Sequence, residues 1–148
     1  MDIKDYIRDI PDFPAPGIMF RDITPLLKNP VAFNYTIGQL VERYQNAGVD
    51  AIVPVESRGF LFGAPLAHKL GKPIVPVRKP GKLPATTHST EYTLEYGSNS
   101  MEIHADGISQ GERVLILDDL LATGGTLAAA ARLVEMAGGV VFDIGVRV

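Results

Sequence analysis

The residues with the most evident chemistry lie in one stretch, VLILDDLLATGGT, which runs from Val114 to Thr126. An apolar run ends there in two adjacent carboxylates, Asp118 and Asp119. Small and hydroxyl residues follow: Ala122, Thr123, Gly124, Gly125 and Thr126. Small side chains let main-chain N–H groups approach an anion, and the N-terminus of a following helix favours negative charge. Carboxylates accept hydrogen bonds from the vicinal hydroxyls of a sugar. The stretch therefore predicts a binding site for a sugar phosphate.

The stretch differs from the common nucleotide-binding motifs. No Lys-Ser or Lys-Thr pair follows the glycines and no GxGxxG occurs in the chain, so neither a Walker loop nor a dinucleotide fingerprint is present. The plain alternative is a strand, turn and helix with an exposed acidic pair. Two adjacent like charges at a strand end destabilise each other, which disfavours that alternative. Thr126 has a second predicted use as the N-cap of the helix.

The composition describes one globular domain. The chain has 148 residues, 46% of them hydrophobic and 21% charged, with a net charge of −3. This balance gives no indication of a nucleic-acid or membrane partner, so an anionic ligand must be held by local groups. The chain has no cysteine, which excludes disulfides and thiolate chemistry. The N-terminus lacks the apolar core of a signal peptide, and no apolar run reaches the ~18 residues of a membrane span. We expect a cytoplasmic protein.

The hydrophobic pattern predicts an α/β domain with a mainly parallel sheet and an inserted hairpin. Residues 1–28 are expected to form an arm or hood, and residues 29–148 the core. Helices are predicted at 29–48, 58–71 and 126–139, and buried strands at 50–56, 72–78, 113–119 and 140–148. A mobile loop is predicted at 79–90, and a hairpin from 91–96 and 101–106 around the turn GSNS. The end of the chain on a strand suggests that a last element is missing.

The stretch from Val114 to Thr126 closely resembles the phosphoribosyl-pyrophosphate (PRPP) signature of the type I phosphoribosyltransferases. FPAPGIMFRDITPLL, SRGFLFGAPLA, VRKPGKLP and LEYG are similar, in the same order, to stretches of the members that act on adenine. The resemblance implies the type I phosphoribosyltransferase fold and the reaction of adenine with PRPP to give AMP and pyrophosphate. In that family the acidic pair contacts the ribose hydroxyls and the following loop binds the 5′-phosphate.

The resemblance also implies a pyrophosphate site built from two basic stretches. The loop around Ser57 and Arg58 would hold the pyrophosphate, with a cis peptide bond between Glu56 and Ser57. The family often has Asp in place of Glu56. From the residues alone, Ser57 is equally an N-cap beside a surface arginine.

The second basic stretch is RKPGK. Lys79 and Lys82 would reach the pyrophosphate, and Arg78 a neighbouring subunit's site. From the residues alone, this is a solvated basic turn. A loop that closes over PRPP would exclude water from the activated sugar.

Glu95 is the carboxylate that, by resemblance, meets the adenine imidazole and assists its deprotonation. Tyr96 would line the PRPP site or the closed loop. Alternation places Tyr92 on one face of the hairpin and Glu91 with Glu95 on the other. Without the resemblance, an amphipathic hairpin with solvated glutamates explains this pattern.

The adenine site implied by the resemblance combines a hood and one core residue. Phe20 would stack on the base, main-chain groups of Met19 and Arg21 would read its edge, and Leu120 would close the opposite face. Without the resemblance, an aromatic in such an arm is a core residue. Mg²⁺ is the implied cofactor, held mainly by PRPP and waters with no direct protein ligand. The three histidines share no ligand spacing and receive no role.

Two rival functions stay open. A phosphoribosyltransferase for a 6-oxopurine would be expected to use a lysine on the exocyclic oxygen, and the hood and LEYG fit adenine better. A non-catalytic PRPP-binding regulator would usually carry an added DNA-binding domain, which this chain lacks. The resemblance also implies a homodimer across the face that bears VRKPGK, and family chains continue past Val148 with another element.

Overall fold

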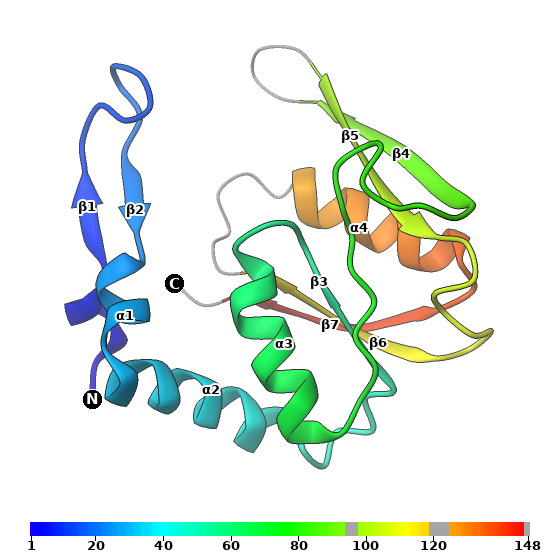
Figure 1. Ribbon diagram of the computed structural model, residues 1–148, viewed down its shortest axis with the longest axis horizontal. Helices are drawn as coiled ribbons and strands as arrows, with labels where there is room; N and C mark the ends of the chain where they lie inside the picture. Colours follow the sequence, from blue (N-terminus) through cyan, green and yellow to red (C-terminus); the bar gives the residue numbers. More distant parts are fainter. Residues whose placement is uncertain (94–97, 119–124, 147–148) are drawn as a thin grey trace. The chain divides into compact units, whose positions relative to one another are not determined.

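The computed structural model describes residues 1–93, 98–118 and 125–146 (Figure 1). The chain divides into two compact units, Met1–Glu42 and Arg43–Val148. The predicted hood ends at residue 28, inside the first unit. The predicted division into a hood and a core stays a prediction.

The first unit opens with a 3-10 helix, η1 (Ile3–Tyr6), and an antiparallel pair of short strands, β1 (Arg8–Ile10) and β2 (Phe20–Asp22). Helix α1 (Thr24–Lys28) follows. The predicted arm had no assigned strands, and the structure adds this strand pair to it. Its period-2 pattern is only three residues long on each side, which is too short to recognise in a sequence.

Asp22 fastens this pair to α1. Its carboxylate accepts hydrogen bonds from Arg8 Nη2 at 2.5 Å, from Thr24 N at 2.9 Å and from Thr24 Oγ1 at 2.9 Å. The hydrogen bond from the Arg8 side chain, aided by those from Thr24, lowers the pKa of Asp22 to about 2. One carboxylate thereby joins the start of β1, the end of β2 and the first turn of α1.

Helix α2 (Pro30–Tyr44) confirms the helix predicted at 29–48. Asn29 Oδ1 accepts hydrogen bonds from Val31 N and Ala32 N, both at 3.1 Å, which satisfies two of the open amides of the first turn. Ile37, Leu40 and Tyr44, spaced three and four residues apart on one face of α2, are buried. The helix ends four residues before Gly48, earlier than predicted.

The second unit contains a parallel sheet in the order β3 (Ala51–Pro54), β6 (Arg113–Asp118), β7 (Val140–Val146). Ala51 to Pro54 pair with Val114 to Leu117, and β6 pairs with β7 around an irregularity between Val114 and Leu115. The predicted strands at 50–56, 113–119 and 140–148 are therefore confirmed in kind.

The predicted strand at 72–78 is wrong as a continuous strand. The segment follows β3 only through isolated parallel bridges, Ile52 with Ile74 and Val55 with Val77. Val75 N donates to Ile52 O at 2.9 Å and Val77 N to Pro54 O at 3.0 Å. Ile52 N and Glu56 N donate back to Pro73 O and Val77 O, but Pro54 of β3, which lies between them, has no N–H to donate and so interrupts the ladder.

The two long helices of this unit cover opposite faces of the sheet (Figure 1). Helix α3 (Gly59–Leu70) lies on the Pro54 side, where Gly63 packs closely against the proline ring. Helix α4 (Gly125–Met136) lies on the side of Val53 and Ile116 and forms the main core with the hairpin. Gly71 ends α3 in the left-handed conformation, with φ of 66°.

The hairpin comprises β4 (Thr87–Thr93) and β5 (Ser98–His104), which pair antiparallel from Thr87 with His104 to Thr93 with Ser98. The predicted hairpin is confirmed, but its limits were wrong. The first strand begins at Thr87, inside the predicted loop 79–90, and the predicted turn GSNS lies largely within β5. Ser98 and Asn99 are exposed, and at such a hairpin end both faces of a strand contact solvent. Strand residues there can therefore be polar, and in a sequence they resemble turn residues.

Across the part of the chain that the structure describes, no helix has the length and apolar character required to cross a membrane.

Replacing Asp22 with Asn should destabilise the chain at neutral pH, and the loss should shrink in acid. The pKa of Asp22 in the folded chain, about 2, lies below the ordinary value of 3.8, so the ionised group stabilises the fold above that value. This stabilisation is lost as the pH falls from about 4 towards about 2. Urea denaturation of both proteins from pH 7 to pH 3 measures the difference. Asp9→Asn is the control, because the Asp9 side chain is 67% exposed. An equal loss at every pH would contradict the assigned pKa.

Candidate functional site

The carboxyl ends of β3 and β6 lie side by side and bring two predicted site segments together. Pro54 pairs with Leu117, so the loop that follows β3 and the acidic end of β6 emerge at the same edge. Gly59 marks the closest approach: a Cβ at this position would lie 2.6 Å from Leu117 O and 3.5 Å from Asp118 Oδ1. Only a residue without a side chain fits there, so the loop that contains Ser57 and Arg58 enters α3 directly against the end of β6.

The loop after β3 has the backbone that the resemblance predicts. The peptide bond between Glu56 and Ser57 is cis. Gly59 N donates to Val55 O at 3.1 Å, Phe60 N to Ser57 O at 3.2 Å and Leu61 N to Arg58 O at 3.1 Å. Arg58 is the N-cap residue of α3, so the alternative in which Ser57 caps the helix is wrong.

Glu56 is bound to the basic stretch that follows in sequence. Its Oε1 accepts hydrogen bonds from Arg78 Nε at 2.8 Å and from Lys79 N at 3.4 Å. Burial of the carboxyl would raise the pKa of Glu56, but the hydrogen bonds from Arg78 and Lys79 and their positive charges outweigh burial and lower it. Glu56 is therefore ionised at neutral pH and fixes the start of RKPGK beside the loop.

Arg78 lies at a junction of three elements. Its main chain pairs with Glu102 of β5, with N–O distances of 2.9 and 2.8 Å, and its guanidinium carbon lies 5.8 Å from the centre of the Phe60 ring in α3. The basic turn, which we define as Lys79–Lys82, follows. Lys79 and Lys82 are exposed. The structure thus places Ser57, Arg58, Arg78 and Lys79 in one region of the second unit.

Of the stretch Val114–Thr126, the structure describes residues 114–118 and 125–126. Asp118 is half-buried at the end of β6, and Gly125 and Thr126 are half-buried in the first turn of α4. Thr126 is the second residue of α4, so its predicted use as N-cap is wrong. Several predicted site residues lie outside the described residues: Asp119, Leu120, Ala122, Thr123 and Gly124.

The predicted general base, Glu95, falls between the two strands of the hairpin in the sequence. Glu95 and Tyr96 lie outside the described residues, in the connection from Thr93 to Ser98. Along β4 the predicted alternation is confirmed, since Glu91 is exposed and Tyr92 packs against the main core. Arg132 of α4 donates to Thr90 Oγ1 at 3.3 Å and to Glu91 O at 2.9 Å, which ties the helix to the hairpin.

The predicted base-binding residues of the first unit lie at the β1–β2 pair. Phe20 and Arg21 belong to β2, and Met19 precedes it with 58% of its surface exposed. Phe13 meets the Phe20 ring in an edge-to-face arrangement with the ring centres 5.1 Å apart.

Sequence reasoning gave no role to the side chains of Glu56, Glu102 and Arg132. Each hydrogen-bonds to a residue at least 15 positions away in sequence. Charged residues are mostly solvated, so a single Glu or Arg in a loop, strand or helix gives no local pattern that marks these three.

The metal-binding capacity of the described residues is limited. Within residues 1–93, 98–118 and 125–146, no three His, Asp or Glu side chains come together in a way that could hold a metal ion. Asp118 offers a carboxylate at the sheet edge, which suits Mg²⁺ through a bound water.

The chain matches the phosphoribosyl transferase domain family over residues 26–146. It is 60% identical over 143 residues to an adenine phosphoribosyltransferase of Chloroflexus aurantiacus, a match that covers 97% of this chain and 83% of that relative. The crystal structure of an adenine phosphoribosyltransferase from Thermoanaerobacter pseudethanolicus is 59% identical, with a TM-score of 0.94, over 97% of this chain and 84% of that one. The adenine phosphoribosyltransferase of Saccharomyces cerevisiae was crystallised with an imino-altritol bisphosphate and adenine. It is 42% identical, with a TM-score of 0.91, over 97% of this chain and 84% of that one. The fold implied by the resemblance is confirmed.

Gly59→Ala should lower the free energy of unfolding by about 1–3 kcal/mol, because the added Cβ collides with main chain that cannot move independently of the sheet. Gly38→Ala is the matched control: Gly38 is in α2 and its added Cβ would meet nothing within 4 Å. That change should instead stabilise the helix by about 0.5–1 kcal/mol. Urea denaturation of the two variants measures both effects. If both variants changed the free energy of unfolding by a similarly small amount, the close contact of Gly59 with Leu117 O would not be a constraint.

Proposed function

The chain belongs to the adenine phosphoribosyltransferases of the phosphoribosyl transferase family, and on that premise we propose that it transfers the 5-phosphoribosyl group of PRPP to adenine. The products are AMP and pyrophosphate, so the reaction serves purine salvage. The observation that supports this proposal is the shared edge of β3 and β6, where Gly59, the residue that follows Ser57 and Arg58, packs against Leu117 and Asp118. A cytoplasmic location is part of the proposal.

The pyrophosphate of PRPP is the ligand we assign to the loop after β3 and to the basic turn. Main-chain N–H groups of Ser57 and Arg58, the Arg58 guanidinium and the ammonium groups of Lys79 and Lys82 would share its charge. Arg78 is paired with Glu56 at 2.8 Å, so we assign it first to holding the turn. The resemblance also implies that Arg78 reaches a neighbouring subunit's site in a homodimer.

The ribose and its 5′-phosphate would occupy the signature stretch. Asp118 and Asp119 would accept hydrogen bonds from the ribose hydroxyls. The phosphate would bind the segment Ala122–Thr126, because that segment leads into the N-terminus of α4. When bound, Mg²⁺ would neutralise charge on the leaving pyrophosphate, and PRPP oxygens and waters would supply its ligands.

The reaction is a displacement at the anomeric carbon of the ribose. A bond forms from an imidazole nitrogen of adenine to this carbon, and the bond from the carbon to the pyrophosphate oxygen breaks with its electron pair. Glu95 would take the proton that the imidazole loses, a general-base contribution typically worth ~10²–10⁴-fold. Negative charge that develops on the pyrophosphate would be stabilised by the Arg58 and Lys79 side chains.

Adenine recognition is assigned to the hood residues and to Leu120. Phe20 would stack on the ring, main-chain groups of Met19 and Arg21 would bind its edge, and Leu120 would pack on the other face. The same chemistry on a 6-oxopurine would require a donor to the exocyclic oxygen.

The test of the function is an assay of nucleotide formation. The purified chain is incubated with PRPP, Mg²⁺ and one purine base at a time, and nucleotide and pyrophosphate are quantified. We expect AMP from adenine and much slower reaction with hypoxanthine, guanine or xanthine. Nucleotide from hypoxanthine but not from adenine would establish the 6-oxopurine alternative, and PRPP binding without any nucleotide would establish the regulator.

Glu95→Leu should lower kcat by about 10²–10⁴-fold and leave the Kd for PRPP nearly unchanged, because the base acts on adenine in the transition state. Steady-state kinetics and a PRPP titration separate the two quantities. Glu91→Leu is the control, since Glu91 is an exposed carboxylate of the same hairpin. Parallel losses of turnover and PRPP affinity would argue against this role for Glu95.

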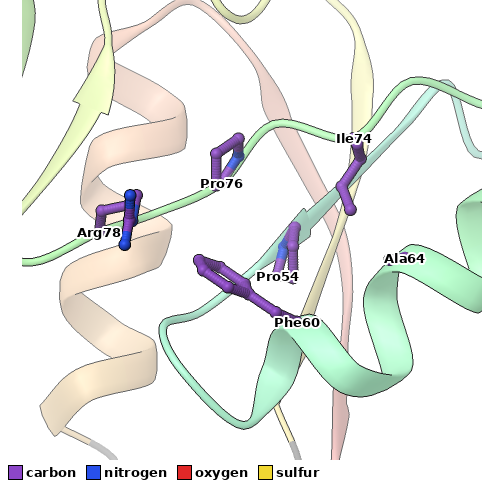
Figure 2. A pocket seen from close by; sticks show the side chains of 6 residues that line it. All are labelled: Pro54, Phe60, Ala64, Ile74, Pro76 and Arg78. Atoms are coloured by element: carbon purple, nitrogen blue, oxygen red, sulfur yellow. The ribbon is translucent and has the colours of Figure 1, made fainter. Parts of the chain in front are cut away.

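A homodimer across the face that carries Arg78 is part of the proposal. A pocket of about 290 Å³ opens beside Arg78 and is lined by Pro54, Phe60, Ala64, Ile74 and Pro76 (Figure 2). Its lining is almost entirely apolar, and Ile74 exposes 43% of its surface. Apolar surface beside a charged turn suits contact with a second copy of the chain.

Ile74→Asp should convert this dimer into a monomer, because the charge would be buried without a partner. Light scattering after size exclusion measures the mass of each species. Val140→Asp is the control, because Val140 is 54% exposed on β7, at the far side of the sheet order from the 72–78 segment. A monomeric parent chain would refute the dimer outright.

A further inference from the structure

Glu102 of β5 is bonded to both ends of the loop that carries the basic turn. Its Oε1 accepts a hydrogen bond from Gly81 N at 3.0 Å, and its Oε2 accepts one from Thr87 Oγ1 at 3.3 Å. Its main chain forms the antiparallel bridge with Arg78. A single residue thus fixes the residue before the turn, an amide within the turn and the first residue of β4.

Glu56 also hydrogen-bonds to the start of the basic turn. Glu56 binds Arg78 Nε and Lys79 N, so Lys79–Lys82 lies between a carboxylate from the β3 loop and one from the hairpin. Both carboxylates accept main-chain N–H groups of the turn itself, at Lys79 and Gly81. Such bonds set the path of the backbone without using the ammonium group of either lysine.

This arrangement has an energetic consequence for an anion that binds the turn. Ordering a flexible segment when a ligand binds costs conformational entropy, and that cost lowers the affinity. A turn already fixed by charge-assisted hydrogen bonds has lost much of that freedom before the ligand arrives. The carboxylate of Glu102 therefore favours binding although it carries the same sign of charge as the ligand.

We propose that Glu102 is a positioning residue for pyrophosphate binding, acting through Gly81 N and Thr87 Oγ1 on the basic turn. The proposal rests on the proposed function, because it takes the pyrophosphate of PRPP as the ligand of Lys79 and Lys82. It assigns Glu102 no contact with the substrate. The expected signature is a change in PRPP and pyrophosphate affinity with little change in the chemical step.

The test compares Glu102→Ala with a matched control, Glu112→Ala. Glu112 Oε1 also accepts a main-chain N–H in an exposed turn, from Ser109 at 2.5 Å, before β6 begins and therefore at the opposite end of that strand from Asp118. Glu102→Ala should raise the KM for PRPP and the Kd for pyrophosphate about tenfold, a loss in the range for one hydrogen bond to a charged group. The kcat and the KM for adenine should stay within about twofold, and Glu112→Ala should leave all four constants unchanged.

Two further variants separate positioning from folding. Glu102→Gln keeps an oxygen that can accept from Gly81 N, so it should restore most of the PRPP affinity. Thr87→Val removes the hydroxyl donor with little change in volume and should reproduce part of the loss. Hydrogen exchange of the segment that contains Gly81 reports the bond directly and should accelerate in Glu102→Ala but not in Glu112→Ala.

The proposal is overturned by either of two results. One is an unchanged exchange rate at Gly81 with unchanged PRPP affinity in Glu102→Ala and Thr87→Val. The other is an equal fall in kcat and in PRPP affinity that Glu102→Gln does not rescue. The proposed function fails separately, in the unaltered chain, if no AMP forms from adenine and PRPP.

Discussion

The parallel pairing of β3 with β6 is the constraint on which the site depends. Their register sets Pro54 opposite Leu117, and the chain then turns into α3 against the end of β6. Gly59 permits this turn because a Cβ there would lie 2.6 Å from a main-chain oxygen. The consequence is that two loops far apart in sequence leave the sheet at one edge, where main-chain amides and a carboxylate can serve different parts of one ligand.

Carboxylates have an unexpected place in a site proposed to bind pyrophosphate. Glu56 is largely buried, with 10% of its side chain exposed, and its ionised form is stabilised by Arg78 and by the Lys79 amide. A buried carboxylate with such partners acts as a fixed acceptor of hydrogen bonds and not as an unpaired charge. The same principle operates at Asp22, which joins the strand pair of the first unit to α1.

Agreement between sequence and structure is best where one local rule suffices. Asn29 caps α2, Gly71 ends α3, and the buried runs of β3 and β6 form parallel strands. The predictions from sequence were wrong where the structure depends on how strands pair with one another. The segment 72–78 looks like a strand, yet Pro54 of the neighbouring β3 cannot donate to it and only isolated bridges form. The turn GSNS was predicted where β5 begins, because polar strand residues resemble turn residues.

The sequence by itself determined the α/β class and, through resemblance, the family; its sugar-phosphate role for the stretch Val114–Thr126 stays a prediction. These follow from hydrophobic periods and from residue types that are adjacent in the chain. Only the tertiary structure decided which distant groups meet: Glu56 with Arg78, Glu102 with Gly81 and Arg132 with Glu91. Such pairs leave no local pattern, because strand register and helix packing, and not neighbouring residues, bring their atoms within hydrogen-bonding distance.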